Sequence, residues 1–232
     1  MTARRTLAIS SLVVLTALAG CDVGSRIPGL GGSENDMLLR IVNTTGTTLD
    51  LTSSGQPVGG EGHVAPGATS GCIRVSEGTT TLGLRQAGAT SDVASFAPTL
   101  TPRTSYTVVA FTSLTGSVQT ATFTNDFVPT TGLAGLRIMD VAPTLGSLDV
   151  YVTPRNGSLD APSTASIGFG SNTGFFDVNP GTSQVRFTQA TTFNVVFDAG
   201  TITLQPGQLS TLVISQPSGT GGAPVASLAP AC

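Results

Sequence analysis

His63, the single histidine of the chain, is the residue best suited to proton transfer near neutral pH. It lies in a Gly-rich segment between two predicted strands, and Glu61 offers a carboxylate that would orient its ring. General-base catalysis also requires a nucleophile within hydrogen-bond reach, and no G-x-S-x-G turn between a strand and a helix supplies one. We therefore expect a solvated loop histidine, no catalytic residue and no enzyme activity.

Patterns that bind metal ions are equally sparse. One histidine cannot supply a zinc cluster, and the cysteines lack the paired spacing of structural zinc sites. The Asp residues form no D-x-D-x-D-G calcium loop, although calcium held by distant carboxylates on neighbouring loops stays open as an alternative. We expect no metal and no cofactor, and the sequence assigns no ligand-binding residue.

Cys21 follows a stretch that has the parts of an export signal. Arg4 and Arg5 precede an apolar run over residues 7–19, which is shorter than the roughly 20 residues that span a bilayer. The segment Leu18-Ala19-Gly20-Cys21 resembles the lipobox of bacterial lipoproteins, whose cysteine is lipidated and becomes the first residue of the mature protein. We expect Cys21 to be the lipidation site. An ordinary secretory signal with an unmodified cysteine is the alternative.

Cys72 and Cys232 remain once Cys21 is assigned to the lipid, and an exported protein meets an oxidising environment. A disulfide between them would close a loop of roughly 160 residues, for which chain entropy gives about 5 kcal/mol as an upper figure. It would hold the C-terminal tail against the first domain. Two free thiols are the alternative.

The composition excludes some partners and favours a β-fold. All ten basic residues are arginine, against 13 acidic ones, and they are dispersed along the chain. No basic stripe is present to neutralise a phosphate backbone, so we do not expect nucleic acid as a partner. Charged residues make up 10% of the chain and hydrophobic ones 39%, which argues against disorder. The polar surface is rich in Thr, Ser and Gly, and abundant Thr and Val favour strands.

An internal repeat relates the two halves of the chain. Short segments match in the same order, and the offset between the copies grows from 97 to 104 positions. The first pair is Leu39-Arg40-Ile41 with Leu136-Arg137-Ile138, and the last is Thr107-Val108-Val109 with Thr211-Leu212-Val213. A slowly growing offset is expected if the second copy carries a few inserted loop residues. The repeat therefore predicts two copies of one domain.

Each copy consists of short alternating segments bounded by Gly, Pro and Asn, without apolar residues at helical spacing. Asp149 alternates with apolar neighbours, so we expect it on the outward face of its strand. The predicted fold is all-β, with two tandem antiparallel β-sandwich domains of immunoglobulin or transthyretin-like type. The predicted organisation is a signal peptide at 1–20, a flexible tether at 21–36, sandwich domains at 37–126 and 135–215, a linker at 127–134 and a Pro/Gly/Ser-rich tail at 216–232.

Three segments of the second copy carry a family resemblance. Residues 136–152 combine an Arg-Ile strand, an Ala-Pro turn and an Asp-Val-Tyr strand; Asn179-Pro180-Gly181-Thr182 forms a Gly-Thr turn, and residues 204–213 close the domain. These features resemble the bacterial family called domain of unknown function 4397. The resemblance covers about 135–215, whereas the first copy replaces the Ala-Pro turn with Asn43-Thr44-Thr45-Gly46. It implies exported or envelope-attached tandem sandwiches without an established activity, and it implies no ligand.

The expected function follows from this address and from the absence of a reactive constellation. We expect a lipid-anchored protein of the bacterial cell envelope with a non-catalytic structural or protein-interaction role. The expected partners are the membrane, through Cys21, and an envelope protein or a glycan. A binding protein for a glycan, peptide or ion that uses the loops at one end of a sandwich is the alternative. The membrane and its leaflet are left open.

Overall fold

The computed structural model describes residues 36–232, apart from 76–77, 80, 97–98, 102 and 217–221. Cys21 and the predicted signal peptide lie outside the described residues, as does all but the last residue of the predicted tether. The described residues form nineteen strands and one 3-10 turn, η1 (Gly60–Gly62), and no α-helix, which confirms the all-β prediction. A helix with the length and apolar character needed to cross a bilayer does not occur in this part of the chain.

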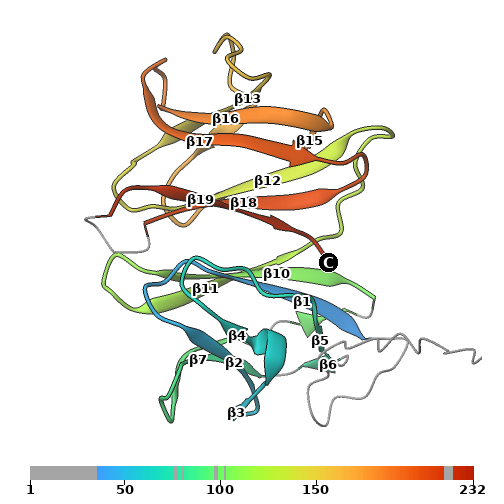
Figure 1. Cartoon of the computed structure of the whole chain (residues 1–232), viewed down its shortest axis with the longest axis vertical. Helices are drawn as coiled ribbons and strands as arrows, with labels where there is room; N and C mark the ends of the chain where they lie inside the picture. Colours follow the sequence, from blue (N-terminus) through green and yellow to red (C-terminus); the bar gives the residue numbers. More distant parts are fainter. Residues whose placement is uncertain (1–35, 76–77, 80, 97–98, 102, 217–221) are drawn as a thin grey trace, which may run out of the picture.

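Four main sheets lie in layers along the long axis of the molecule, two for each sandwich (Figure 1). We call the two that face each other across the middle of the molecule the inner sheets, and the other two the outer sheets. The strands of the first sandwich, in chain order, are β1 (Met37–Asn43), β2 (Leu49–Ser53), β3 (Gln56–Pro57), β4 (His63–Val64), β5 (Ile73–Val75), β6 (Gly78–Thr79), β7 (Leu82–Gln86), β8 (Asp92–Phe96), β9 (Thr99–Leu100), β10 (Ser105–Thr112) and β11 (Val118–Thr124).

The strands of the second sandwich are β12 (Ala134–Val141), β13 (Leu148–Thr153), β14 (Thr164–Ile167), β15 (Asn172–Val178), β16 (Gly181–Gln189), β17 (Val195–Leu204), β18 (Leu209–Ser215) and β19 (Val225–Pro230). Both sandwiches repeat one topology. The inner sheet of the first has the order β11-β10-β1-β5, and that of the second has the equivalent order β19-β18-β12-β15. The outer sheets are likewise built around equivalent runs, β2-β7-β8 and β13-β16-β17.

The sandwiches are antiparallel with one exception in each. The first strand of each copy pairs in parallel with the last strand but one of the same copy, β1 with β10 and β12 with β18. The predicted antiparallel sandwiches thus contain one parallel pair each. Parallel neighbours require a long connection. Here the whole outer sheet of each sandwich lies between the paired strands along the chain, so each domain closes by bringing its two ends together.

Each sandwich has its own apolar core between its inner and outer sheets. In β1, Met37, Leu39 and Ile41 point into the first core, as strand alternation requires. Leu136 and Ile138 of β12 point into the second core in the same way. Several intervening positions of the inner strands are apolar as well, among them Val42, Val109 and Val213, because their opposite face is covered by the other sandwich.

Two predictions of local structure need correction. Residues 225–230 belong to the predicted loose tail, yet they form β19, which pairs with β18 over six residues. Asp149 does lie on the face away from the core, but it is buried, because Ser166 of β14 and the backbone N–H of Thr191 donate to its carboxylate.

Candidate functional site

His63 forms a cross-strand pair. It lies on β4 rather than in a loop, and its Nδ1 is 2.6 Å from Oδ1 of Asp50 on the neighbouring strand β2. The same place in the second sandwich is occupied by Asp149 of β13 and Ser166 of β14. A carboxylate that accepts from a side chain on the next strand is therefore common to both copies, and the imidazole is one way to supply the donor.

Glu61, the residue expected to orient His63, has a different partner. Its carboxylate accepts a hydrogen bond of 2.7 Å from the backbone N–H of Gly71. Groups of three or more His, Cys, Asp or Glu side chains able to hold a metal ion do not occur among the described residues. The structure thus brings together His63 and Asp50, but no nucleophile and no ligand set around them.

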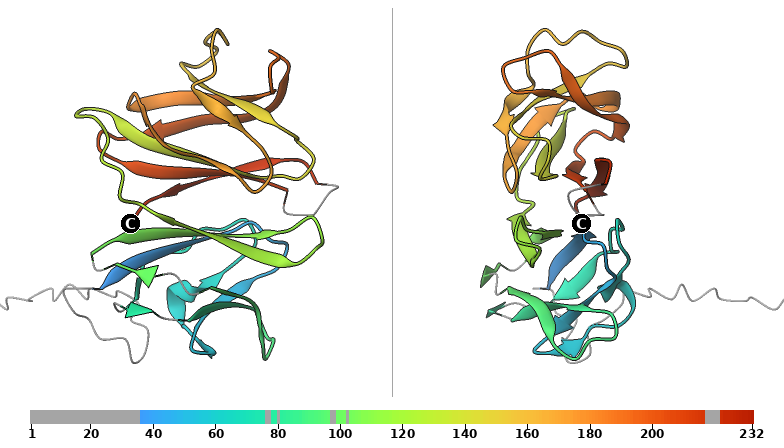
Figure 2. Two further views of the ribbon diagram at one scale, coloured as in Figure 1. Left: turned by 180° about the vertical axis from the view of Figure 1, so that it is seen from behind. Right: turned by 90° about the vertical axis from the view of Figure 1, so that its left-hand side faces the viewer.

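The disulfide predicted from the sequence is present. Cys72 is bonded to Cys232, with their Cα atoms 5.8 Å apart. Cys72 directly precedes β5 of the first sandwich, and Cys232 follows β19 of the second, so the bond crosses from one sandwich to the other. Both views of Figure 2 place the C-terminus between the two inner sheets.

The predicted linker crosses the same boundary in the opposite direction. It leaves β11 of the first sandwich and runs beside β15 of the second, where the ring of Phe127 stacks on Phe175 at 5.6 Å between centroids. Thr130 donates to the carboxylate of Asp177 from both its backbone N–H and its hydroxyl. Because β11 is equivalent to β19 and β15 to β5, the linker and the disulfide are equivalent crossings at the two ends of one interface.

The interface itself is an apolar cluster between the inner sheets. Val42 and Val109 of the first sandwich meet their counterparts Met139 and Val213 of the second. Phe111, Val141 and Ala229 complete the buried part of this cluster. Each sandwich thus uses the same face toward the other, which is the geometry of an isologous contact between two copies.

Arg137 is the polar centre of this contact. Its guanidinium lies 4.4 Å from the ring centroid of Phe123 on β11 and 4.3 Å from that of Phe175 on β15, so it is held between rings from both sandwiches. It donates to Oγ1 of Thr211 at 2.9 Å, to Oδ1 of Asn125 at 3.0 Å and to the carbonyl of Thr124 at 3.1 Å. Burial lowers the pKa of Arg137 to about 10, an effect that the nearby charge of Asp126 partly offsets. The cation remains charged at neutral pH and fixes the relative position of the two sandwiches.

Asp140 differs from its counterpart in the first sandwich. That counterpart, Asn43, is fully bonded: its Oδ1 accepts from Thr45, and its Nδ2 donates to the carbonyls of Thr47 and Val64 at 2.8 and 2.9 Å. Asp140 keeps the first interaction, because its Oδ1 accepts from the N–H of Ala142 at 2.8 Å. Its buried Oδ2 has no partner among the described residues. Burial raises the pKa of Asp140 to about 6, partly offset by the hydrogen bond from Ala142.

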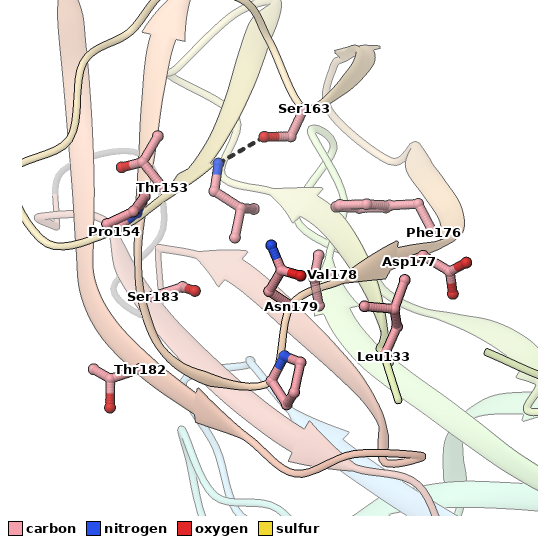
Figure 3. Close-up of a pocket in the computed structure, with 12 residues that line it drawn as sticks. Leu133, Thr153, Pro154, Ser163, Phe176, Asp177, Val178, Asn179, Thr182 and Ser183 are labelled. Carbon is pink, nitrogen blue, oxygen red and sulfur yellow. Dashed lines mark hydrogen bonds between the residues drawn. The ribbon is translucent and has the colours of Figure 1, made fainter. Parts of the chain in front are cut away.

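A cavity of about 440 Å³ opens at the end of the second sandwich where β13 ends and β16 begins (Figure 3). Its walls come from the inner and outer sheets and from the turn before β16. The lining residues are neutral apart from one carboxylate, and they are Leu133, Val152, Thr153, Pro154, Ser163, Phe176, Asp177, Val178, Asn179, Pro180, Thr182 and Ser183. Apart from the turn at Asn179-Pro180-Gly181-Thr182, no sequence pattern indicates this cavity, because its lining residues come from four separate parts of the chain.

Comparison with known families places part of the chain. The model of the family described as "Domain of unknown function (DUF4397)" matches residues 37–151, so this part of the chain is similar to that family. The match covers the first sandwich together with β12 and the first four residues of β13. The resemblance noted in the sequence was drawn from the second copy, and the family model includes the first copy despite its different turn at Asn43.

Comparisons with curated proteins and with solved structures add little information about function. No curated protein matches the chain. A solved structure of the C-terminal domain of AlgF from P. aeruginosa is 18% identical, and the alignment covers 43% of this chain and 98% of that one, with a TM-score of 0.32.

Proposed function

We propose that this protein is a lipid-anchored component of the bacterial cell envelope with a non-catalytic structural or protein-interaction role. Cys21 would attach it to a membrane, and the tether would separate that membrane from the first sandwich. The two sandwiches would then act as one rigid body that presents its outer surfaces to an envelope partner.

The observation that carries this proposal is that the chain crosses the interface at both of its ends. The linker crosses it at one end, the Cys72–Cys232 bond crosses it at the other, and the buried Arg137 is bonded to both sandwiches between them. Enzymes depend on reactive groups, and hinged receptors depend on domains that move. In this protein the buried polar group at the interface, Arg137, is bonded to both domains and holds them in one orientation.

A second candidate is a binding protein that takes a small ligand at the end of a sandwich. The cavity of the second sandwich favours it, because its volume lies within the range of about 300–1,000 Å³ that is typical of ligand sites. The ligand chemistry that fits this cavity is considered below.

The anchoring and the interaction role can be tested in one experiment. A photo-crosslinking residue is placed in intact cells at Val196 of the second sandwich or at Val93 of the first, both exposed positions on outer-sheet strands. We expect membrane fractionation, labelling by radioactive palmitate and a discrete cross-linked adduct from at least one of the two positions. Cys21→Ser should abolish the labelling and the fractionation, and it should change the adduct.

Two results would count against the proposal. Unchanged labelling of the Cys21→Ser variant would exclude the lipid anchor. Absence of any adduct from either outer sheet, in cells that retain the protein at the membrane, would exclude a stable partner on these surfaces.

A further inference from the structure

The cavity of the second sandwich is lined by apolar side chains that can contact the face of a small ring. Val178 is buried at the base, and Phe176 and Val152 are half-buried beside the second core. Pro154 and Pro180 contribute further apolar surface. Figure 3 shows Asn179 in the middle of the lining residues, with Phe176 on one side and Thr153 on the other.

The polar groups of the cavity are hydroxyls and one amide. Ser163 accepts a hydrogen bond of 2.8 Å from the N–H of Val152, so its own hydroxyl proton remains available to a ligand. The side chains of Asn179 and Ser183 form no hydrogen bond with other described residues, which leaves an amide and a hydroxyl able both to donate and to accept.

The cavity offers no charge to a ligand. Asp177 is the only ionisable residue that lines it, and its two carboxylate oxygens accept from the backbone N–H and the hydroxyl of Thr130 in the linker. Figure 3 shows this carboxylate on the side away from Asn179. A charged ligand would find no counter-charge here, and desolvating it would cost free energy without compensation.

We propose that this cavity binds a neutral, hydroxyl-rich ligand, namely a sugar residue of an uncharged glycan. A pyranose ring presents an apolar C–H face and an equatorial rim of hydroxyls. The ring of Phe176 and the side chain of Val178 match the first, and the groups of Ser163, Asn179 and Ser183 match the second. This mixture of apolar walls and a few convergent neutral polar groups is typical of specific small-molecule sites.

A peptide fits the cavity less well. An extended peptide gains most of its affinity by pairing with the free edge of a strand. Beyond its last pairing with β14, at Val150, β13 would offer the N–H of Val152, but the hydroxyl of Ser163 already occupies that donor. We therefore expect the ligand to be bound by side chains rather than by hydrogen bonds to a strand backbone.

The test uses the mature two-sandwich protein with its disulfide intact and ¹³C-labelled methyl groups. Neutral saccharides (gluco-, galacto- and manno-oligomers and N-acetylhexosamine oligomers) are titrated in, followed by uronic-acid oligomers and an unrelated Ala/Ser peptide. We expect at least one neutral saccharide to shift the methyl signals of Leu133, Val152 and Val178 together. The charged oligomers and the peptide should leave these signals unchanged.

A pair of variants separates binding at this cavity from binding elsewhere. Asn179→Ala with Ser183→Ala removes two hydrogen-bonding groups and should raise the Kd roughly tenfold. The control pair is Ser95→Ala with Gln119→Ala, exposed polar residues of the first sandwich, and it should leave the Kd within twofold. Thermal unfolding checks that both pairs stay folded.

Three results would overturn the inference: no neutral saccharide shifts the three methyl signals, an uronic-acid oligomer or the peptide shifts them more strongly, or the cavity pair binds as tightly as the control pair. None of these results bears on the anchor or on the rigid interface, so the proposed structural role would stand or fall separately.

Discussion

The two sandwiches share one strand order but meet the same local demands with different side chains. At the end of the first inner strand, the fold requires a buried polar group that caps the following turn. The first sandwich uses Asn43, whose amide is bonded at both ends, and the second uses Asp140, whose Oδ2 is left without a partner among the described residues. Topology therefore fixes where a polar group must be, whereas the group is a neutral amide in one copy and a titratable carboxyl in the other.

At a second pair of equivalent positions, Arg40 and Arg137, it is the second sandwich that has the more extensively bonded side chain. Arg40 of β1 is half-buried near the disulfide, where one Nη donates to Sγ of Cys72 at 3.0 Å. Arg137 of β12 is held between two rings and bonded to three other residues. The second sandwich therefore supplies the polar contact that joins the two copies, and the first supplies its acceptors in Thr124 and Asn125.

The largest expected effect comes from opening the covalent crossing. In the Cys72→Ser/Cys232→Ser protein, the free energy of unfolding should fall by about 3–5 kcal/mol, because a long loop of the unfolded chain is no longer closed. Urea unfolding of the oxidised parent and the double variant measures this. Equal midpoints would mean that the bond does not constrain the chain.

The next effect tests the asymmetry between the two arginines. Arg137→Ala should cost about 3 kcal/mol, because it leaves the acceptors at the interface unpaired and empties the space between Phe123 and Phe175. Arg40→Ala should cost less than about 1 kcal/mol. If the two variants lose the same stability, the interface does not depend on Arg137.

A pH-dependent effect tests the asymmetry between Asn43 and Asp140. The pKa of Asp140 is about 6 in the folded protein, against an ordinary value of 3.8, so the folded state binds this proton more tightly than the unfolded state. The stabilisation is fully present below about pH 4 and is lost as the pH rises through 6, by roughly 3 kcal/mol in total. Asp140→Asn should remove this dependence and raise the stability at pH 7.

The reciprocal change provides the control for that prediction. Asn43→Asp places a carboxylate opposite the carbonyls of Thr47 and Val64, so it should lower the stability at pH 7 and restore it on acidification. Chemical denaturation at several pH values measures both variants. A stability that falls toward low pH in the parent protein would give the wrong sign.

The smallest effect concerns the cross-strand pair on the outer sheets. His63 is well exposed, and its side chain replaces the role that Ser166 has in the second sandwich. His63→Ser should therefore change the free energy of unfolding by less than about 1 kcal/mol, since exposed ion pairs contribute little. A large loss, or loss of a partner interaction in cells, would give His63 a role that its position does not explain.

The sequence predicts the sandwiches well because alternation and turn residues are local signals. The inner strands at Met37–Asn43 and Ala134–Val141 contain the two tripeptides of the first repeat pair, Leu39-Arg40-Ile41 and Leu136-Arg137-Ile138. Their mutual packing was missed, although a signal was present: Val108–Phe111 and Leu212–Ile214 are apolar at every position, which indicates strands covered on both faces.

Other features depend on contacts that no local pattern contains. Strand β19 was missed because its surroundings are rich in Pro, Gly and Ser, and its pairing comes from the open edge of β18. The partners of Arg137 come from β11, from Asn125 just after it, from β15 and from β18, and the cavity near Asn179 likewise combines distant segments. The lipid anchor at Cys21 stays a prediction from the sequence.

The two sandwiches form one body that is closed at both ends of their interface. Differential scanning calorimetry of the oxidised mature protein tests it most directly, because two independent domains melt separately. We expect one transition whose calorimetric and van't Hoff enthalpies agree for the whole chain, and which splits when Arg137→Ala is combined with loss of the disulfide. Two separate transitions in the parent protein would mean that the sandwiches unfold independently and do not form one body.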